Sequence, residues 1–164
     1  MVARCGAAKT ATSDDAAACG AAAKIAQLCG YLPLFVGICG GAISNYDGDA
    51  AWQTELVDML MSKRLEVIDA ADEEEGSTVE QVVGTSLTML KDDLAEDVFQ
   101  ILSLVPEDVP TPMEAVQLLW TACLPTHAAK AKPIVVRKVC KKLLDRNLLM
   151  GSTADGVHLH DIVR

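Results

Sequence analysis

The chain has 164 residues, of which 51% are hydrophobic and only 4% are aromatic, and its formal net charge is −9. This length excludes a large multidomain assembly, and the hydrophobic fraction excludes an intrinsically disordered chain. A core of aliphatic side chains with few aromatic rings favours packed helices, while the acidic balance argues against a general polyanion-binding protein.

The six cysteines form no paired motif. None of them are separated by two residues as in C-x-x-C, and most have apolar or alanine-rich neighbours. Free cysteine packs as a small hydrophobic residue, so we expect buried, reduced thiols rather than a disulfide framework, and we predict no redox or zinc site. Reduced thiols are typical of the cytoplasm, which is the expected location. The cysteines are Cys5, Cys19, Cys29, Cys39, Cys123 and Cys140.

The first predicted helix covers residues 16–29, after a poorly specified lead-in of residues 1–12. Ser13 is a favoured N-cap residue ahead of an alanine-rich run, and Gly30 is the favoured residue just past a helix end. These two signals predict both ends of the helix.

A proline turn and a second buried helix follow. Pro33 holds Leu32 extended, and the helix is predicted over residues 34–43. It belongs to a charge-free run of 22 residues, Ile25–Tyr46, which is formally long enough to span a bilayer. Four glycines, a proline and three polar residues interrupt this run, so we expect no membrane-spanning helix.

The middle of the chain alternates loops and amphipathic helices. Residues 44–49 are predicted to form a loop, and residues 50–62 a helix with Trp52 on its apolar face. Residues 69–76 hold consecutive carboxylates and are predicted to form a solvated acidic loop, because a straight carboxylate run does not fold around a cation. Residues 79–90 have the apolar spacing of another helix.

Two further helices are predicted from their first residues. Asp92 and Asp93 are acidic first-turn residues, and they open a helix whose apolar stripe ends at Pro106. The segment 111–114 reads Thr-Pro-Met-Glu, which is a capping box with proline at the first helical position. It predicts a helix over residues 112–122.

The last predicted helix, residues 134–147, has a basic face. The segment Lys130–Arg146 carries seven basic side chains against one aspartate. Beyond it, short apolar runs at residues 148–150 and 157–160 flank residues 152–156, which read as the turn of a β-hairpin with an Asp-Gly signal.

These elements predict a mainly α fold in two parts. Three helices followed by a hairpin are the order of a winged helix, and residues 91–164 have this order. We therefore expect a helical bundle over residues 13–90 and a winged-helix subdomain with a small C-terminal β-hairpin over residues 91–164.

Six short motifs occur in order along the chain. They are the CGYLPL segment Cys29–Leu34, Trp52, the L-x-x-L-x-x-D-L spacing that begins at Leu87, the VFQILSLVPED segment Val98–Asp108, the LLW segment Leu118–Trp120, and VHLHDIVR at Val157–Arg164. This series resembles the GLPL, FPED, L-W and MHD motifs of NB-ARC ATPases, the signalling switches of plant disease-resistance proteins and animal apoptosome scaffolds. The resemblance covers residues 13–164.

The resemblance implies a helical bundle and winged helix that bind ADP or ATP. In the family, the GLPL proline packs on the adenine of ADP, and the MHD histidine contacts its β-phosphate. By motif position these roles fall to Pro33 and His160, with Asp161 orienting the local backbone. The chain has Tyr31 where the GLPL motif has glycine, and Leu159 where the MHD motif has methionine.

The largest departure from the family is a missing phosphate loop. The 164 residues contain no G-x-x-x-x-G-K-[ST] motif and no apolar run ending in the paired aspartates of a Walker B motif. The segment Gly20–Lys24 is too short to form that loop, and Val105 stands where the FPED motif has phenylalanine. Without a phosphate cradle and a magnesium ligand, we expect no ATP hydrolysis by this chain alone and predict no catalytic residue.

The resemblance also implies partners. A nucleotide-binding domain, in the same polypeptide or in a partner protein, would supply the missing motifs, and the active state would be a homo-oligomer. The role implied is that of an ADP-binding conformational relay in defence or cell-death signalling.

Other interpretations of the same residues stay open. Pro33 can serve only as a rigid turn between two core helices. The basic helix and hairpin can belong to a DNA-binding winged helix. The chain can also be a non-catalytic protein-interaction module, which docks to a partner that supplies the nucleotide-binding half. His158 and His160 have a spacing compatible with metal ligation, but no thiol pair is near them in the sequence, so no metal is predicted.

Overall fold

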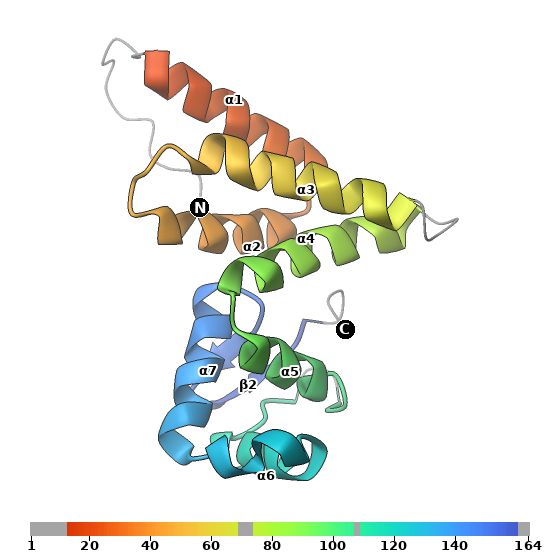
Figure 1. The fold of residues 1–164 in the computed structure, drawn as a ribbon, viewed down its shortest axis with the longest axis vertical. Helices are drawn as coiled ribbons and strands as arrows, with labels where there is room; N and C mark the ends of the chain where they lie inside the picture. Colours follow the sequence, from red (N-terminus) through yellow and green to blue (C-terminus); the bar gives the residue numbers. More distant parts are fainter. Residues whose placement is uncertain (1–12, 69–73, 107–108, 161–164) are drawn as a thin grey trace. The chain divides into compact units, whose positions relative to one another are not determined.

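A computed structural model describes residues 13–68, 74–106 and 109–160 of the chain (Figure 1). This part is mainly helical and has a small antiparallel β-hairpin near its C-terminal end, which confirms the coarse fold class predicted from the sequence. The lead-in predicted at residues 1–12 lies outside the described residues. The chain divides into two compact units, Met1–Thr85 and Ser86–Arg164.

The first unit is built from helices. They are α1 (Ser13–Leu28), α2 (Pro33–Ile43), the short 3-10 helix η1 (Ser44–Tyr46), α3 (Trp52–Ile68) and α4 (Glu74–Leu90), within which the division between the units falls. Figure 1 shows α1 and α3 side by side, and these two helices pack against each other. The predicted helices over residues 16–29, 34–43, 50–62 and 79–90 are all present.

The acidic loop predicted at residues 69–76 is partly wrong. Helix α4 begins at Glu74, so residues 74–76 are helical, and residues 69–73 lie outside the described residues. Carboxylates near a helix N-terminus interact favourably with the backbone N–H groups there, so an acidic run is compatible with the first turn of a helix.

The long charge-free run is divided among several elements. It contains the end of α1, a turn, the 11 residues of α2 and all of η1. At a rise of 1.5 Å per residue, α2 is about 16 Å long, roughly half the thickness of a bilayer core. Among the described residues, no helix combines the length and apolarity that crossing a membrane requires.

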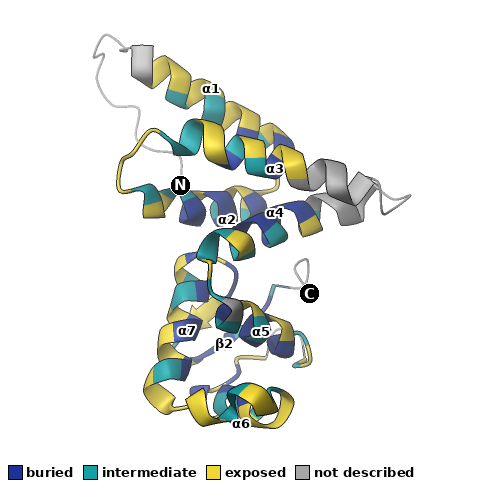
Figure 2. Cartoon of the chain, in the orientation of Figure 1, coloured by how far each residue is buried: buried dark blue, intermediate teal, exposed yellow. Residues whose placement is uncertain are grey.

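The core of the first unit centres on one face of α2. Figure 2 shows how this helix alternates between buried and exposed positions, with Phe35 and Ile38 among its buried residues. The side-chain amide of Gln81 on α4, itself buried, donates a hydrogen bond to the backbone carbonyl of Leu60 on α3. The buried hydrophobic residues of this unit are Ile25, Leu28, Cys29, Phe35, Ile38, Cys39, Ala42, Leu56, Leu60, Val82 and Val83.

After the end of α4, the described residues of the second unit form helices, a 3-10 segment and the hairpin. These elements are α5 (Asp93–Leu102), α6 (Met113–Cys123), η2 (Pro125–Lys130), α7 (Pro133–Asp145), β1 (Met150–Ser152) and β2 (Gly156–His158). Helix α5 packs against α6 and α7, and α7 also contacts β1. The predicted strand over residues 157–160 is wrong at its end, because β2 stops at His158 and His160 lies beyond it.

The capping box predicted at residues 111–114 is also wrong. The N-cap of α6 is Pro112, and no side chain caps it. Thr111 instead forms an isolated antiparallel bridge with Val157, in which each backbone N–H donates to the carbonyl of the other residue at N···O distances of 2.8 and 3.0 Å. This pairing adds a third extended segment beside the hairpin.

The core of the second unit surrounds Trp120. Its side chain is 0% exposed, and the indole N–H donates to the backbone carbonyl of His127 at 3.2 Å, which satisfies the polar atom of a buried ring. The other buried hydrophobic residues are Ala95, Val98, Phe99, Ile101, Leu102, Met113, Val116, Ala131, Val136, Val139, Cys140, Leu143, Leu148, Leu149, Val157 and Leu159.

Two glycines make the hairpin possible. Gly151 has a φ of 94°, and a Cβ placed there would lie 2.3 Å from the carbonyl oxygen of Gly156. Gly156 has a φ of 110°, and its Cβ would lie 3.0 Å from the carbonyl oxygen of Thr111. Both the backbone angles and the close approach of neighbouring backbone therefore require glycine at these positions.

We predict that Gly151→Ala lowers the free energy of unfolding by about 2 kcal/mol or more, since it adds a clash to a strained φ. The matched control is Gly40→Ala in α2, where an added Cβ meets nothing within 4 Å and φ is ordinary. The control should raise stability by about 0.5–1 kcal/mol through helix propensity. Urea denaturation measures both, and equal stability of the two variants would contradict the described hairpin.

Candidate functional site

The corner between α1 and α2 carries the GLPL-like residues. Helix α1 ends in a Schellman motif: Gly30 N–H donates to the Gln27 carbonyl at 3.0 Å, and Tyr31 N–H donates to the Ala26 carbonyl at 2.9 Å. Gly30 has a φ of 60°, as this motif requires of the residue just past the helix. The predicted stop signal at Gly30 is therefore confirmed.

Tyr31 and Pro33 lie on the surface of this corner. Leu32 is extended, with a φ of −74° and a ψ of 122°, and Pro33 opens α2, where its missing N–H costs no helical hydrogen bond. Tyr31 has a φ of 59° and is 72% exposed. It adopts the left-handed conformation that glycine adopts without steric cost, at the position where the GLPL motif has glycine.

We predict that Tyr31→Gly raises the free energy of unfolding by about 0.5–1 kcal/mol. Relief of the left-handed conformation gains about 1–2 kcal/mol, and the greater freedom of glycine in the unfolded chain cancels part of that gain. The control is Tyr31→Ala, which removes the ring but keeps the Cβ and should bring no gain. Chemical denaturation of the two variants distinguishes a backbone effect from loss of an exposed ring.

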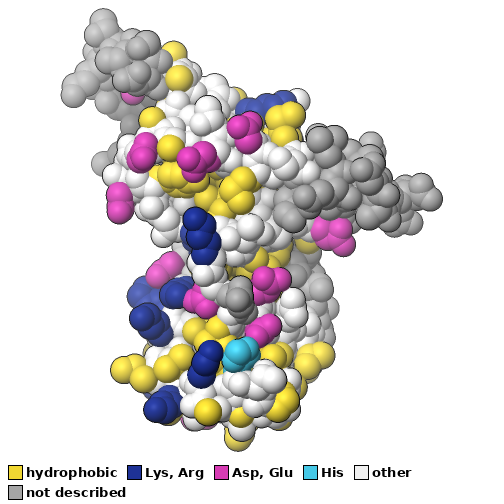
Figure 3. Space-filling model, in the orientation of Figure 1, with side chains coloured by type: hydrophobic (Ala, Val, Ile, Leu, Met, Phe, Trp, Pro, Cys, Tyr) yellow, Lys and Arg dark blue, Asp and Glu magenta, His cyan; other side chains and the backbone are white. Residues whose placement is uncertain are grey.

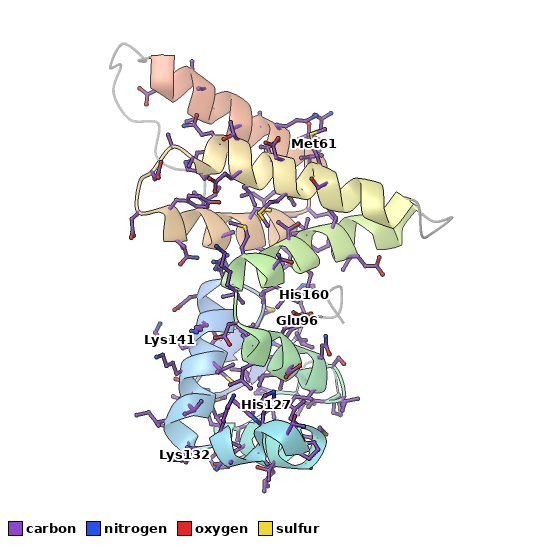
Figure 4. All side chains as sticks on the ribbon, in the orientation of Figure 1. Met61, Glu96, His127, Lys132, Lys141 and His160 are labelled. Atoms are coloured by element: carbon purple, nitrogen blue, oxygen red, sulfur yellow. The ribbon has the colours of Figure 1, made fainter. Side chains whose placement is uncertain are left out.

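His160 follows the last strand of the second unit. Strand β2 pairs with β1 on one edge and with Thr111 on the other, which holds its residues at a fixed register, and His160 comes two residues after its end. Leu159, in the position of the MHD methionine, is buried, and His160 is half-buried (Figure 4). Asp161, expected to orient the backbone, lies outside the described residues.

The two predicted site residues belong to different units of the chain. Pro33 belongs to the first unit and His160 to the second. Each has a defined local setting: Pro33 is exposed at the start of a helix, and His160 is half-buried after a paired strand. The contacts with a single nucleotide that the resemblance implies thus remain a prediction.

The other two histidines, His127 and His158, have contacts within the second unit. His158 pairs with Met150 across the hairpin, and His127 lies with its Nε2 3.7 Å from the Asp97 carboxylate. Figure 4 labels His127 beside α6. Among the residues that the structure describes, no group of three or more His, Cys, Asp or Glu side chains is arranged to hold a metal ion.

The segment Lys130–Arg146, on and before α7, exposes less unpaired positive charge to a ligand than its sequence suggests. Figure 3 shows Lys and Arg side chains gathered over the α7 side of the second unit. Arg146 is only 6% exposed, Lys142 pairs with Asp92, and Lys141 pairs with Asp145 at 2.9 Å. The exposed basic residues of this segment are Lys130, Lys132, Arg137, Lys138 and Lys141, and of these Lys141 has the ion pair with Asp145.

The ion pair between Asp92 and Lys142 joins the start of α5 to the end of α7. Asp92 is the N-cap of α5, and its carboxylate also accepts from the backbone N–H of Ala95 at 3.4 Å. Partial burial opposes the charged form, but the Lys142 ammonium and the backbone donors outweigh it and lower the pKa of Asp92. Sequence analysis identified the acidic helix start and missed its basic partner.

We predict that Asp92→Ala destabilises the protein by about 1–2 kcal/mol at neutral pH, because it removes both the cap and the ion pair. Asp92→Asn keeps a capping side chain and should cost less. Because the folded-state pKa of Asp92 is depressed, its contribution is full above about pH 5 and is lost as the pH falls below about 4. The control is Lys141→Ala, whose exposed pair should contribute under about 0.5 kcal/mol. Denaturation curves across this pH range measure the difference, and a pH-independent cost would refute the electrostatic part.

Two cysteines from different predicted helices have their side chains in contact. The sulfur atoms of Cys29, after α1, and Cys39, in α2, are 3.6 Å apart and buried. The prediction of buried thiols is confirmed for these two and for Cys140, but it is wrong for Cys19 and Cys123, which are exposed. Cys5 lies outside the described residues. Sequence spacing gave no sign of the pair, because the two residues come from different helical elements.

Comparisons of the chain with protein-family models, with curated proteins and with solved structures give no match. The resemblance to NB-ARC ATPases therefore rests on the motifs in the sequence. The structure gives a defined local geometry to the corner with Pro33 and to the segment with His160, the two motifs for which the resemblance implies nucleotide contacts.

Proposed function

We propose that this chain is the ADP-binding, conformational-relay portion of an NB-ARC-type signalling switch, and that it is not catalytic alone. The observation that carries the proposal is the pairing of Thr111 with Val157, which ties the segment before α6 to the C-terminal hairpin. It supports a winged-helix organisation of the second unit, and the MHD-like residues follow directly from the paired strand.

The order of elements agrees with this interpretation. A helix, an extended bridge, two further helices and a hairpin succeed one another in the second unit. Trp120, from the LLW motif, is buried in the core, and Val98, the first residue of the VFQILSLVPED segment, is buried on α5. Buried positions for these two motif residues are what we expect if the chain has the NB-ARC fold.

The adenine contact is proposed for Pro33. Its ring is exposed at the first position of α2, and the backbone around it is fixed by the Schellman motif before it. A rigid proline ring on a fixed corner can pack on the face of a purine at little entropic cost. The neighbouring Tyr31 ring adds bulk that the family's glycine lacks.

The proposed mechanism is a shift between two populations. ADP contacting both Pro33 and His160 favours a closed arrangement of the two units, and nucleotide exchange releases the winged helix for homo-oligomerisation. The phosphate cradle and magnesium ligand come from a nucleotide-binding domain of the same polypeptide or of a partner. This chain supplies the contacts that sense which nucleotide is bound.

Calorimetric titration with ADP tests the proposal. We predict weak binding by the chain and about tenfold weaker binding by His160→Ala, which corresponds to 1.4 kcal/mol. Pro33→Ala should also weaken binding, since it removes the ring while keeping a residue that a helix start accepts. The matched control is His127→Ala, a half-buried histidine of the same unit outside the motif. Absent heat, or equal affinity in all variants, would refute a retained site.

A DNA-binding winged helix is the weaker alternative. It would use the basic face of α7, but the burial of Arg146 and the pairing of Lys141 and Lys142 reduce the charge available to phosphates. Salt-dependent binding of duplex DNA would favour this alternative over the nucleotide relay. A non-catalytic interaction module would show neither ADP nor DNA binding.

A further inference from the structure

The sulfur atoms of Cys29 and Cys39 lie close enough to react with each other. The two sulfur atoms are 3.6 Å apart, and a disulfide bond is about 2.05 Å long, so the sulfurs need to approach by about 1.5 Å. Cys29 is 0% and Cys39 is 3% exposed, and either sulfur can donate a hydrogen bond to the other. We propose that these two cysteines form a redox-active pair that closes into a disulfide under hydroperoxide oxidants.

The hydrogen bond between the two thiols favours the thiolate of Cys29, which is the reactive form of the side chain. The hydrogen bond from Cys39 lowers the pKa of the Cys29 thiol, although burial opposes this, and the same bond, burial and the nearby negative charge raise the pKa of Cys39. The pair therefore holds a thiolate at Cys29 more readily than an isolated buried thiol would. By contrast, burial raises the pKa of the Cys140 thiol to about 11.

The reaction balances with one hydroperoxide. The Cys29 thiolate attacks a peroxide oxygen, which breaks the O–O bond, forms a sulfenic acid and, after proton uptake, releases water or an alcohol. The Cys39 sulfur then attacks the sulfenic sulfur, loses its proton and expels the hydroxyl group as water. Two electrons pass from the two thiols to the peroxide, and a dithiol reductant restores both thiols.

The disulfide would close the corner between α1 and α2. The two cysteines are ten residues apart in the sequence, and the exposed residues of the corner, Tyr31, Leu32 and Pro33, lie between them. The backbone near Cys29 is already tied down: its N–H donates to Ile25 at 2.9 Å, and its carbonyl accepts from Leu32 at 3.1 Å. A covalent link at this place restricts opening of the first unit at its corner. This proposal does not depend on nucleotide binding.

The experiment uses the full chain with Cys5, Cys19 and Cys123 replaced by serine, which leaves three thiols. The protein is treated with hydrogen peroxide, and the thiols that remain are alkylated in denaturant. Chymotrypsin then cuts between the two cysteines, at Tyr31 and Phe35, whereas trypsin has no site between Lys24 and Lys63. Intact mass and peptide mapping identify the oxidised residues.

We expect two of the three thiols to be lost. The intact mass before alkylation should be lower by two hydrogen atoms, one alkyl group should be added instead of three, and the peptides of Cys29 and Cys39 should be joined. Cys140 should remain fully alkylated, and a dithiol reductant should restore all three thiols. The oxidised protein should melt about 5 °C higher, as expected for a cross-link that restricts the unfolded chain.

The variants Cys29→Ala and Cys39→Ala should lose the cross-link and the rise in melting temperature, whereas Cys140→Ala should keep both. If an alanine variant fails to fold, the peptide map of the three-thiol protein decides alone. Three alkylated thiols after treatment would overturn the proposal. So would sulfinic acid on Cys29 beside an alkylated Cys39, or a cross-link that includes Cys140.

Discussion

The antiparallel bridge between Thr111 and Val157 is the constraint on which the second unit depends. Each hairpin strand has only three residues, which is too short for an isolated two-stranded ribbon to be stable in water. Backbone hydrogen bonds on the free edge of β2 tie the hairpin to the segment before α6. The same bridge brings Gly156 against the Thr111 carbonyl, which explains the need for glycine there, and it fixes the point from which the chain continues to His160.

Local signals predicted the helices well. Gly30 acts within a few residues, and α1 ends there in a Schellman motif. Pro33 and Asp92 also mark helix starts, although each lies one position from its predicted place: Pro33 is the first residue of α2, not the turn before it, and Asp92 is the N-cap of α5, not a first-turn residue. The errors arose where a distant partner competes with a local signal. Thr111 has the sequence of a capping residue, but its backbone pairs with β2, and no local pattern predicts that choice. The strand end at His158 is also a matter of pairing between segments, since its partner is Met150 on β1.

The candidate site was predicted only in part, for similar reasons. Motif position selected Pro33 and His160, and the structure defines the backbone around each of them. The Asp92–Lys142 pair and the Cys29–Cys39 pair escaped prediction, because each joins residues on different elements and neither has a fixed spacing. One signal could have suggested the thiol pair: one cysteine directly precedes the stop signal at Gly30, and another lies in the apolar helix that follows.

The placement of the two tryptophans has a spectroscopic consequence. The chain has only two, Trp52 at the start of α3 and Trp120 in the core of the second unit. Trp120 has no exposed surface, while Trp52 is half-buried, so the two indoles differ in polarity of environment and in access to a quencher such as iodide. Each unit therefore carries its own intrinsic fluorophore. Loss of structure in one unit can be followed by emission wavelength without labelling the protein.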